Sequence, residues 1–267
     1  MLDAIWVAAL VRALTAGTVV VLASVLAEMR GPVWGALIIS LPVTAGPVYV
    51  FMVLEHDAAF VSAAALNGFA ANAATGLFLI VYAKRAMDRA LVSALGPAAL
   101  VWIAAAMAIS VVSWTPGRAF LLNVTVYGSG LILARPARPG TLAPGASVAR
   151  PSARDLLVRA VAVALFVSAV LALSTALGPS LTGVVAAYPV TLTSTFVILH
   201  RRVGGAAMAR LAGITIRGVF GFGLTLLTLH LLGRPYGAAA ALSGGFLVSL
   251  IWSAGLLLLQ PRTHRAD

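Results

Sequence analysis

The sequence GPVWGALIISLPVTAGPVY at residues 31–49 has a second copy of its pattern in GPSLTGVVAAYPVTLTSTF at residues 178–196. In each copy a Gly-Pro pair opens an apolar run, and Pro-Val-Thr interrupts that run about ten residues later. At the same offset of 147 residues, LVRA at residues 10–13 matches LVRA at residues 157–160. A register that holds over this length predicts an internal duplication of the chain.

The composition places the duplication in a membrane. Hydrophobic residues make up 61% of the 267 residues, and charged residues make up 9%. The mean hydropathy is +1.05, so the chain has more apolar surface than a soluble domain of this size can bury. There is no cysteine, which excludes disulfides and thiolate sites. The net charge of +11 is explained by Arg in cytoplasmic loops, and no nucleic-acid partner is expected.

Nine apolar runs are long enough, at about 20 residues, to cross a hydrocarbon core of about 30 Å. They are predicted to be α-helices, because a membrane-spanning segment must satisfy its own backbone groups and no strand-like alternation is present. The expected fold is an all-α polytopic integral membrane protein with about nine transmembrane helices. The expected segments are 4–27, 32–53, 58–83, 90–114, 118–134, 156–177, 179–199, 204–232 and 236–260.

The distribution of basic residues predicts the orientation. With the N-terminus outside, twelve Arg and Lys residues lie on the cytoplasmic side, whereas Arg118 and Arg234 lie outside. The positive-inside rule therefore favours an N-out, C-in topology. The charge asymmetry and the high Ala and Arg content favour a multi-pass protein of a bacterial inner membrane.

The counterpart of the first expected span lies five spans later in the chain and therefore crosses the membrane in the opposite direction. The two copies of the duplication thus have opposite orientations. The expected organisation is a first repeat at 1–114, a connecting transmembrane helix at 115–134, a cytoplasmic Pro/Arg linker at 135–155 and an inverted second repeat at 156–267. Inverted repeats of four helices are typical of secondary transporters, whose substrate lies near the bilayer midplane between the repeats.

The two Pro-Val-Thr sequences are candidate parts of a site. Pro42 and Pro189 lie in the middle of expected spans, where each removes an amide donor; at Pro189 this frees the carbonyl of Val185. Thr44 and Thr191 add hydroxyl groups beside these prolines. Unwound helices there would direct positive dipole ends toward an anion. The alternative is a plain kink with no ligand.

Glycine strips mark two further spans. Gly68-x3-Asn72-x3-Gly76 matches Gly213-x3-Arg217-x3-Gly221 at an offset of 145, and residues four apart share one helical face. A small-residue packing seam explains the glycines. It does not explain Arg217.

Arg217 is expected near mid-membrane, where an arginine costs at least about 2.5–3.5 kcal/mol. Arg210 lies two turns earlier on the same side, and all seven acidic residues lie at expected helix ends or loops. We therefore expect an anion site formed by seven residues. The alternative is that Arg217 is a structural tie to carbonyls and water. The expected site residues are Arg217, Asn72, Pro42, Thr44, Pro189, Thr191 and Arg210.

Other charged positions are less informative. Arg12 and Arg159, which the duplication pairs, lie near helix ends and are expected to reach the membrane interface. His230 near the outer end of its span is either a proton-carrying group or, in the plainer interpretation, an interfacial residue.

These features favour a transporter-like protein that moves a small anionic solute. No catalytic motif is found, so neither an enzyme, a cofactor nor a metal is expected. The expected partners are the solute, membrane lipids and a second copy of the chain in a homo-oligomer. Two other classes fit the sequence, namely a lipid-handling or channel-like protein and a non-transporting scaffold subunit.

Overall fold

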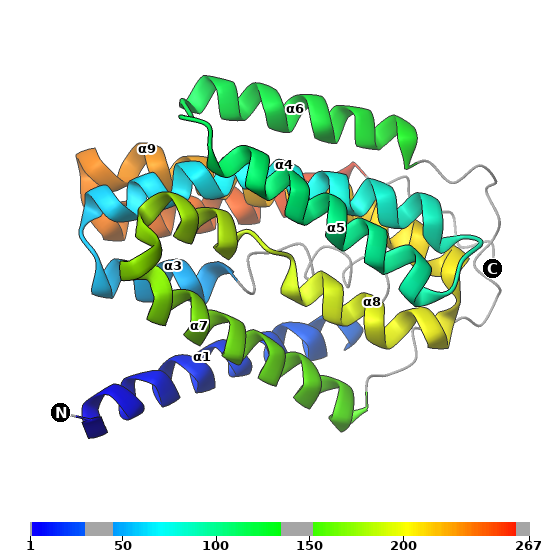
Figure 1. Ribbon diagram of the computed structural model, residues 1–267, viewed down its shortest axis with the longest axis horizontal. Helices are drawn as coiled ribbons and strands as arrows, with labels where there is room; N and C mark the ends of the chain where they lie inside the picture. The colour runs from blue at the N-terminus through cyan, green and yellow to red at the C-terminus, as the bar shows by residue number, and fades with distance from the viewer. Residues whose placement is uncertain (1, 30–44, 135–151, 260–267) are drawn as a thin grey trace.

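The computed structural model describes residues 2–29, 45–134 and 152–259, and within these ranges every regular element is an α-helix (Figure 1). The all-helical prediction is confirmed for the described residues. Pro42 and Thr44 lie outside the described residues. The helices are α1 (Leu2–Met29), α3 (Ala45–Glu55), α4 (Ala58–Ala86), α5 (Leu91–Ser110), α6 (Pro116–Leu133), α7 (Ala153–Ala186), α8 (Val190–Val203) and α9 (Gly205–Leu258).

Four of these helices are long and apolar enough to cross a membrane, namely α4, α5, α7 and α9. Shorter apolar helical stretches cover Val11–Ala23 and Gly46–Glu55. The prediction of a membrane protein is supported at this level. Helix α7 begins at Ala153, three residues inside the range expected as a linker.

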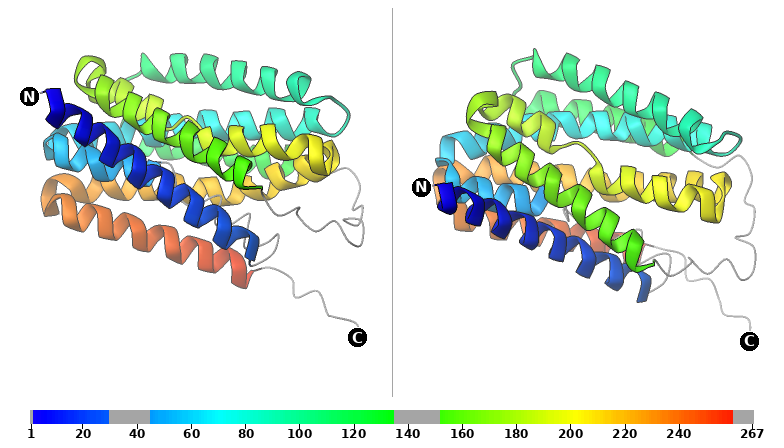
Figure 2. Two further views of the ribbon diagram at one scale, coloured as in Figure 1. Left: turned by 90° about the horizontal axis from the view of Figure 1, so that it is seen from below. Right: turned by 60° about the horizontal axis from the view of Figure 1, so that its bottom comes forward.

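The two longest helices change direction at a glycine. In α7 the break is at Gly178, with φ 69° and ψ 172°, and in α9 it is at Gly237, with φ 81° and ψ 175°. Both residues adopt a left-handed φ that only glycine reaches without strain. After Gly237 the last part of α9 runs back alongside the first part (Figure 2).

Helix α4 occupies the centre of the bundle and is buried over most of its length. It packs against α5, α6, α7 and α9. The crossing with α7 is close: a Cβ atom at Gly183 would lie 2.0 Å from the carbonyl oxygen of Ala64. Small residues on both helices therefore fix how the centre of the bundle packs.

The helix termini gather at two ends of the bundle (Figures 1 and 2). At one end α3 stops, α4 starts and α9 bends; at the other α4 and α8 stop and α7 and α9 start. Each end has an ion pair: Arg12 of α1 with Glu55 of α3, and Asp155 of α7 with Arg202 of α8. We call them the Glu55 end and the Arg202 end.

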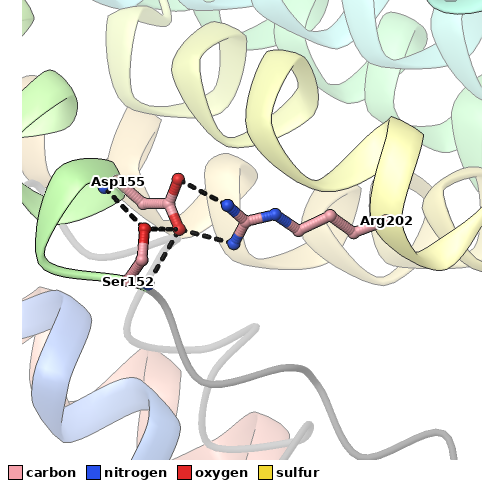
Figure 3. A network of polar contacts seen from close by, with 3 residues as sticks. All are labelled: Ser152, Asp155 and Arg202. Atoms are coloured by element: carbon pink, nitrogen blue, oxygen red, sulfur yellow. Dashed lines mark hydrogen bonds and ion pairs between the residues drawn. The ribbon is translucent and has the colours of Figure 1, made fainter.

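The pair at the Arg202 end is bidentate (Figure 3). Arg202 donates to both carboxylate oxygens of Asp155 at 2.5 and 2.8 Å, and the backbone N–H of Ser152 donates at 2.8 Å in a capping box. Asp155 precedes the apolar run that starts at Leu156. Burial alone would raise the pKa of Asp155, but the hydrogen bonds from Arg202 and Ser152 hold it below its ordinary value.

The two arginines expected at the membrane interface, Arg12 and Arg159, have different environments in the structure. Arg12 is paired with Glu55, and Arg159 is buried with only 4% of its surface exposed. Neither environment follows from the position of an arginine near a helix end, because both depend on a neighbouring helix.

Candidate functional site

The second Pro-Val-Thr sequence does interrupt a helix. Helix α7 ends at Ala186 and α8 begins at Val190, with the buried Pro189 at the N-cap position of α8. The carbonyl of Val185, which the sequence predicts to be free, accepts a hydrogen bond from the N–H of Tyr188 at 2.9 Å. The carbonyl of the buried Ala187 accepts from the hydroxyl of Thr75 on α4 at 3.0 Å.

The break lies at the same depth as Asn72 and Arg217. Measured from the Arg202 end at 1.5 Å per residue, Asn72 lies roughly 21 Å into α4, Val190 roughly 20 Å into α8 and Arg217 roughly 18 Å into α9. The end of α4 and the start of α9 lie at the same level, because a Cβ atom at Gly205 would lie 1.8 Å from the carbonyl oxygen of Ala86. Helix α8 ends at Val203, two residues before Gly205. Asn72, Arg217 and the start of α8 thus lie in one layer near the middle of the bundle.

Asn72 is held in a buried hydrogen-bond network that joins three helices. Its amide nitrogen donates to Asn123 Oδ1 of α6 at 3.2 Å and to the carbonyl of Val219 of α9 at 3.1 Å. Asn123 in turn donates to the carbonyls of Phe69 and Ala119. Both donors of Asn123 are directed at carbonyls, so its Oδ1 must face Asn72, and this fixes the orientation of both amides.

This network changes the role expected of Asn72. Both of its N–H donors are used inside the protein, whereas its Oδ1, in a side chain that is 1% exposed, has no hydrogen-bond partner among the described residues. Asn72 therefore offers an acceptor, suited to a water, a hydroxyl or a protonated acid. It does not offer a donor to an anion.

Arg217 lies on a different face of α9 from the residues that meet Asn72. Ile216 and Val219 are buried and the carbonyl of Val219 meets Asn72, whereas Arg217 and Ile214 are exposed. The carbonyl of Arg217 accepts a hydrogen bond from Trp252 Nε1 of the returning part of α9 at 2.8 Å. The guanidinium makes no ion pair with a carboxylate in the described ranges. Asn72 and Arg217 therefore share a depth but not a single cluster.

Arg210 and Thr191 are the other predicted site residues that the structure describes. Arg210 is half-buried and lies two turns from Arg217, on the side of α9 that includes Ile214. Thr191 is half-buried in the first turn of α8, where its carbonyl accepts from the hydroxyls of Ser194 and Thr195.

No family model, curated protein or solved structure matches the chain.

Sequence reasoning missed the polar side chains that connect the broken helix to α4 and α5. Trp102 Nε1 of α5 donates to Thr75 Oγ1 at 3.1 Å, and the Trp102 ring meets the edge of Tyr188 with centroids 4.8 Å apart. Tyr127 donates to the carbonyl of Asn72 at 2.8 Å. Threonine and tryptophan are common in apolar spans, so these residues had no sequence signal beyond their hydrogen-bonding groups.

The layer offers several polar groups that could contact a ligand. Among the described residues no group of three or more His, Asp or Glu side chains could hold a metal ion. The layer instead contains a cation, an unpaired amide oxygen and a helix break.

Proposed function

We propose that the chain is a multi-pass membrane transporter that moves a small anionic solute past Arg217. The observation that carries the proposal is the exposed guanidinium of Arg217, at mid-depth in an apolar helix and without a carboxylate partner in the described residues. An arginine at this depth is costly unless an anion, water or backbone carbonyls stabilise it. A passing anion is the partner that also gives a function.

The helix break beside this layer supports the same proposal. Transporter sites are typically formed where a spanning helix is discontinuous, because the half-helix termini direct backbone dipoles at the ligand. Helix α8 starts at such a break, with Pro189 as its N-cap residue and no side-chain cap. The first turn of α8 thus directs backbone N–H groups toward mid-depth.

The orientation and the nine-span inverted repeat are part of the proposal. In the proposed topology the part of α7 before Gly178 is one span, and the short part after Gly178 together with α8 is the next. Helix α9, divided at Gly237, supplies two further spans. The basic last turns of α4 and α8 then lie at the Arg202 end, which we assign to the cytoplasm. In this arrangement the Arg12–Glu55 pair of the first half lies at the outer end of the bundle, and the Asp155–Arg202 pair of the second half lies at the cytoplasmic end.

The second candidate function is lipid handling, and one observation favours it. Arg217 is exposed rather than enclosed, so a lipid phosphate reaching into the bundle would meet the same guanidinium. A lipid-handling protein would move fluorescent phosphatidylglycerol between leaflets of a vesicle, whereas a solute transporter would not.

The test is exchange of labelled anions in proteoliposomes. Vesicles loaded with unlabelled phosphate, sulfate, acetate or succinate are given the same labelled anion outside, and accumulated label is measured. We expect one of these anion classes to exchange with the wild type and exchange to fall at least tenfold in Arg217→Gln, because the charge-assisted contact is lost.

Arg201→Gln is the matched control, since Arg201 is an exposed arginine in the last turn of α8, outside the layer. Exchange should be unchanged in that variant. Equal exchange in wild type and Arg217→Gln, or lipid movement without anion exchange, would overturn the proposal.

A further inference from the structure

A cavity of about 440 Å³ opens at the Glu55 end, separate from the layer around Arg217. Its volume lies within the roughly 300–1,000 Å³ of ligand pockets. The wall combines residues from α4, α7, α9 and the loop between α5 and α6. The polar residues that matter here are Ser62, Asn67, Ser113, Ser180, His230 and Arg234.

The cavity has a positive charge that no described carboxylate neutralises. Glu55 is paired with Arg12, and Asp57 caps α4 by accepting from the N–H of Phe60 at 2.7 Å. Arg234 is exposed and makes no ion pair or hydrogen bond within the described ranges. Its five N–H donors are therefore available to a ligand.

Hydrogen bonds between Ser62 of α4 and His230 of α9 hold the cavity wall behind Arg234 in place. His230 Nδ1 lies 2.9 Å from the carbonyl oxygen of Ser62, and the Ser62 hydroxyl donates to the carbonyl of His230 at 3.1 Å. A carbonyl can only accept, so Nδ1 carries the hydrogen and His230 is fixed in one ring orientation. Ser62 is 1% exposed, which makes this side of the cavity a packed wall.

Two hydroxyls complete the set of donors. Ser113 and Ser180 are exposed and have no hydrogen bond within the described residues, so both can donate to a ligand. By contrast, Trp114 Nε1 is already bonded to the carbonyl of Ile109 at 2.9 Å, so its indole contributes a wall rather than a donor. A cation with uncommitted hydroxyls and no carboxylate matches an oxyanion.

We propose that this cavity binds an oxyanion, a free phosphate or the phosphate of a lipid headgroup, through Arg234, Ser113 and Ser180. Binding itself does not depend on the proposed function. The role of the cavity as the outer vestibule that loads anions toward Arg217 does rest on that function, and the variants below separate the two.

Phosphate binding is measured by tryptophan fluorescence, because Trp114 lines the cavity. The protein is placed in nanodiscs of phosphatidylcholine and titrated with inorganic phosphate. We expect a saturable change in the wild type that is absent from Trp114→Phe, and an affinity at least tenfold weaker in Arg234→Gln. Arg118→Gln is the control, since Arg118 is an exposed arginine of the same end that does not line the cavity.

A second set of nanodiscs, containing phosphatidylglycerol, separates the two sources of phosphate. If the lipid weakens free-phosphate binding in competition, the headgroup occupies the cavity; if it has no effect, a free oxyanion is the ligand. A change that persists in Arg234→Gln, or no phosphate response in the wild type in either lipid, overturns the inference. Loss in Arg217→Gln alone would place the response at the mid-depth layer instead.

Discussion

The two glycine strips, Gly68–Gly76 in α4 and Gly213–Gly221 in α9, differ in what surrounds them, although the spacing of their glycines matches. In α4 the strip is a packing seam: Cβ atoms at Gly68 and Gly76 would lie 2.5 Å from Tyr49 Oη and 2.8 Å from Val126 Cγ1. Asn72 between them is bonded to α6 and α9. In α9 the strip meets Trp252 at Gly221, but the side chain of Arg217 is exposed. The first strip is explained by packing, whereas we propose that the arginine in the second strip binds a ligand.

The largest stability effect is expected where α7 crosses the α4 strip. A Cβ atom in Gly183→Ala would overlap the carbonyl oxygen of Ala64 at 2.0 Å, so the helices must separate. Overpacking costs about 1–3 kcal/mol, which corresponds to a melting temperature lowered by roughly 2–12 °C. Gly128→Ala is the matched control, because a Cβ atom there meets nothing within 4 Å. Similar melting temperatures for both variants would show that the crossing is looser than described.

A smaller loss is expected in Asn72→Leu. The change leaves Asn123 Oδ1 without the donor that it has in the native network. Hydrogen bonds between membrane helices contribute about 0.6–1.7 kcal/mol, so unfolding in a detergent titration should become easier by about 1 kcal/mol. Asn67→Leu serves for comparison, since Asn67 donates to the carbonyl of Ala63 in its own helix and should show little change. If the α4 strip stabilised the fold only through its glycines, Asn72→Leu and Asn67→Leu would change the free energy of unfolding equally.

Trp252→Phe should have the smallest effect and sharpens the comparison within α9. The indole N–H bonds the backbone carbonyl of Arg217, so its loss removes one hydrogen bond of about 0.5–1.5 kcal/mol. The guanidinium does not depend on this bond. Anion exchange in proteoliposomes should therefore persist in Trp252→Phe, whereas its disappearance would show that the exposed side of α9 is positioned through Trp252.

The parts of this fold that are local in sequence could be predicted. Apolar runs predict helices, and a missing amide donor at Pro189 predicts the break between α7 and α8. The strip periodicity also places Asn72 and Arg217 at one depth. What the strips do not predict is the neighbour on each face, because that depends on how separate helices pack. The Asn72–Val219 bond and the Arg202–Asp155 pair are of this kind. So is the cavity at the Glu55 end.

The most direct test of the central claim is a thermal-shift screen of the purified protein against phosphate, sulfate, acetate and succinate, with Arg217→Gln and Arg201→Gln in parallel. A ligand that binds the folded state raises the melting temperature by an amount set by its concentration relative to its Kd. We expect one anion class to stabilise the wild type and Arg201→Gln but not Arg217→Gln. Without ligand, Arg217→Gln should be at least as stable as the wild type, because a costly charge has been removed. A shift that survives in Arg217→Gln, or an unliganded variant that is strongly destabilised, would contradict the account and identify Arg217 as a structural tie.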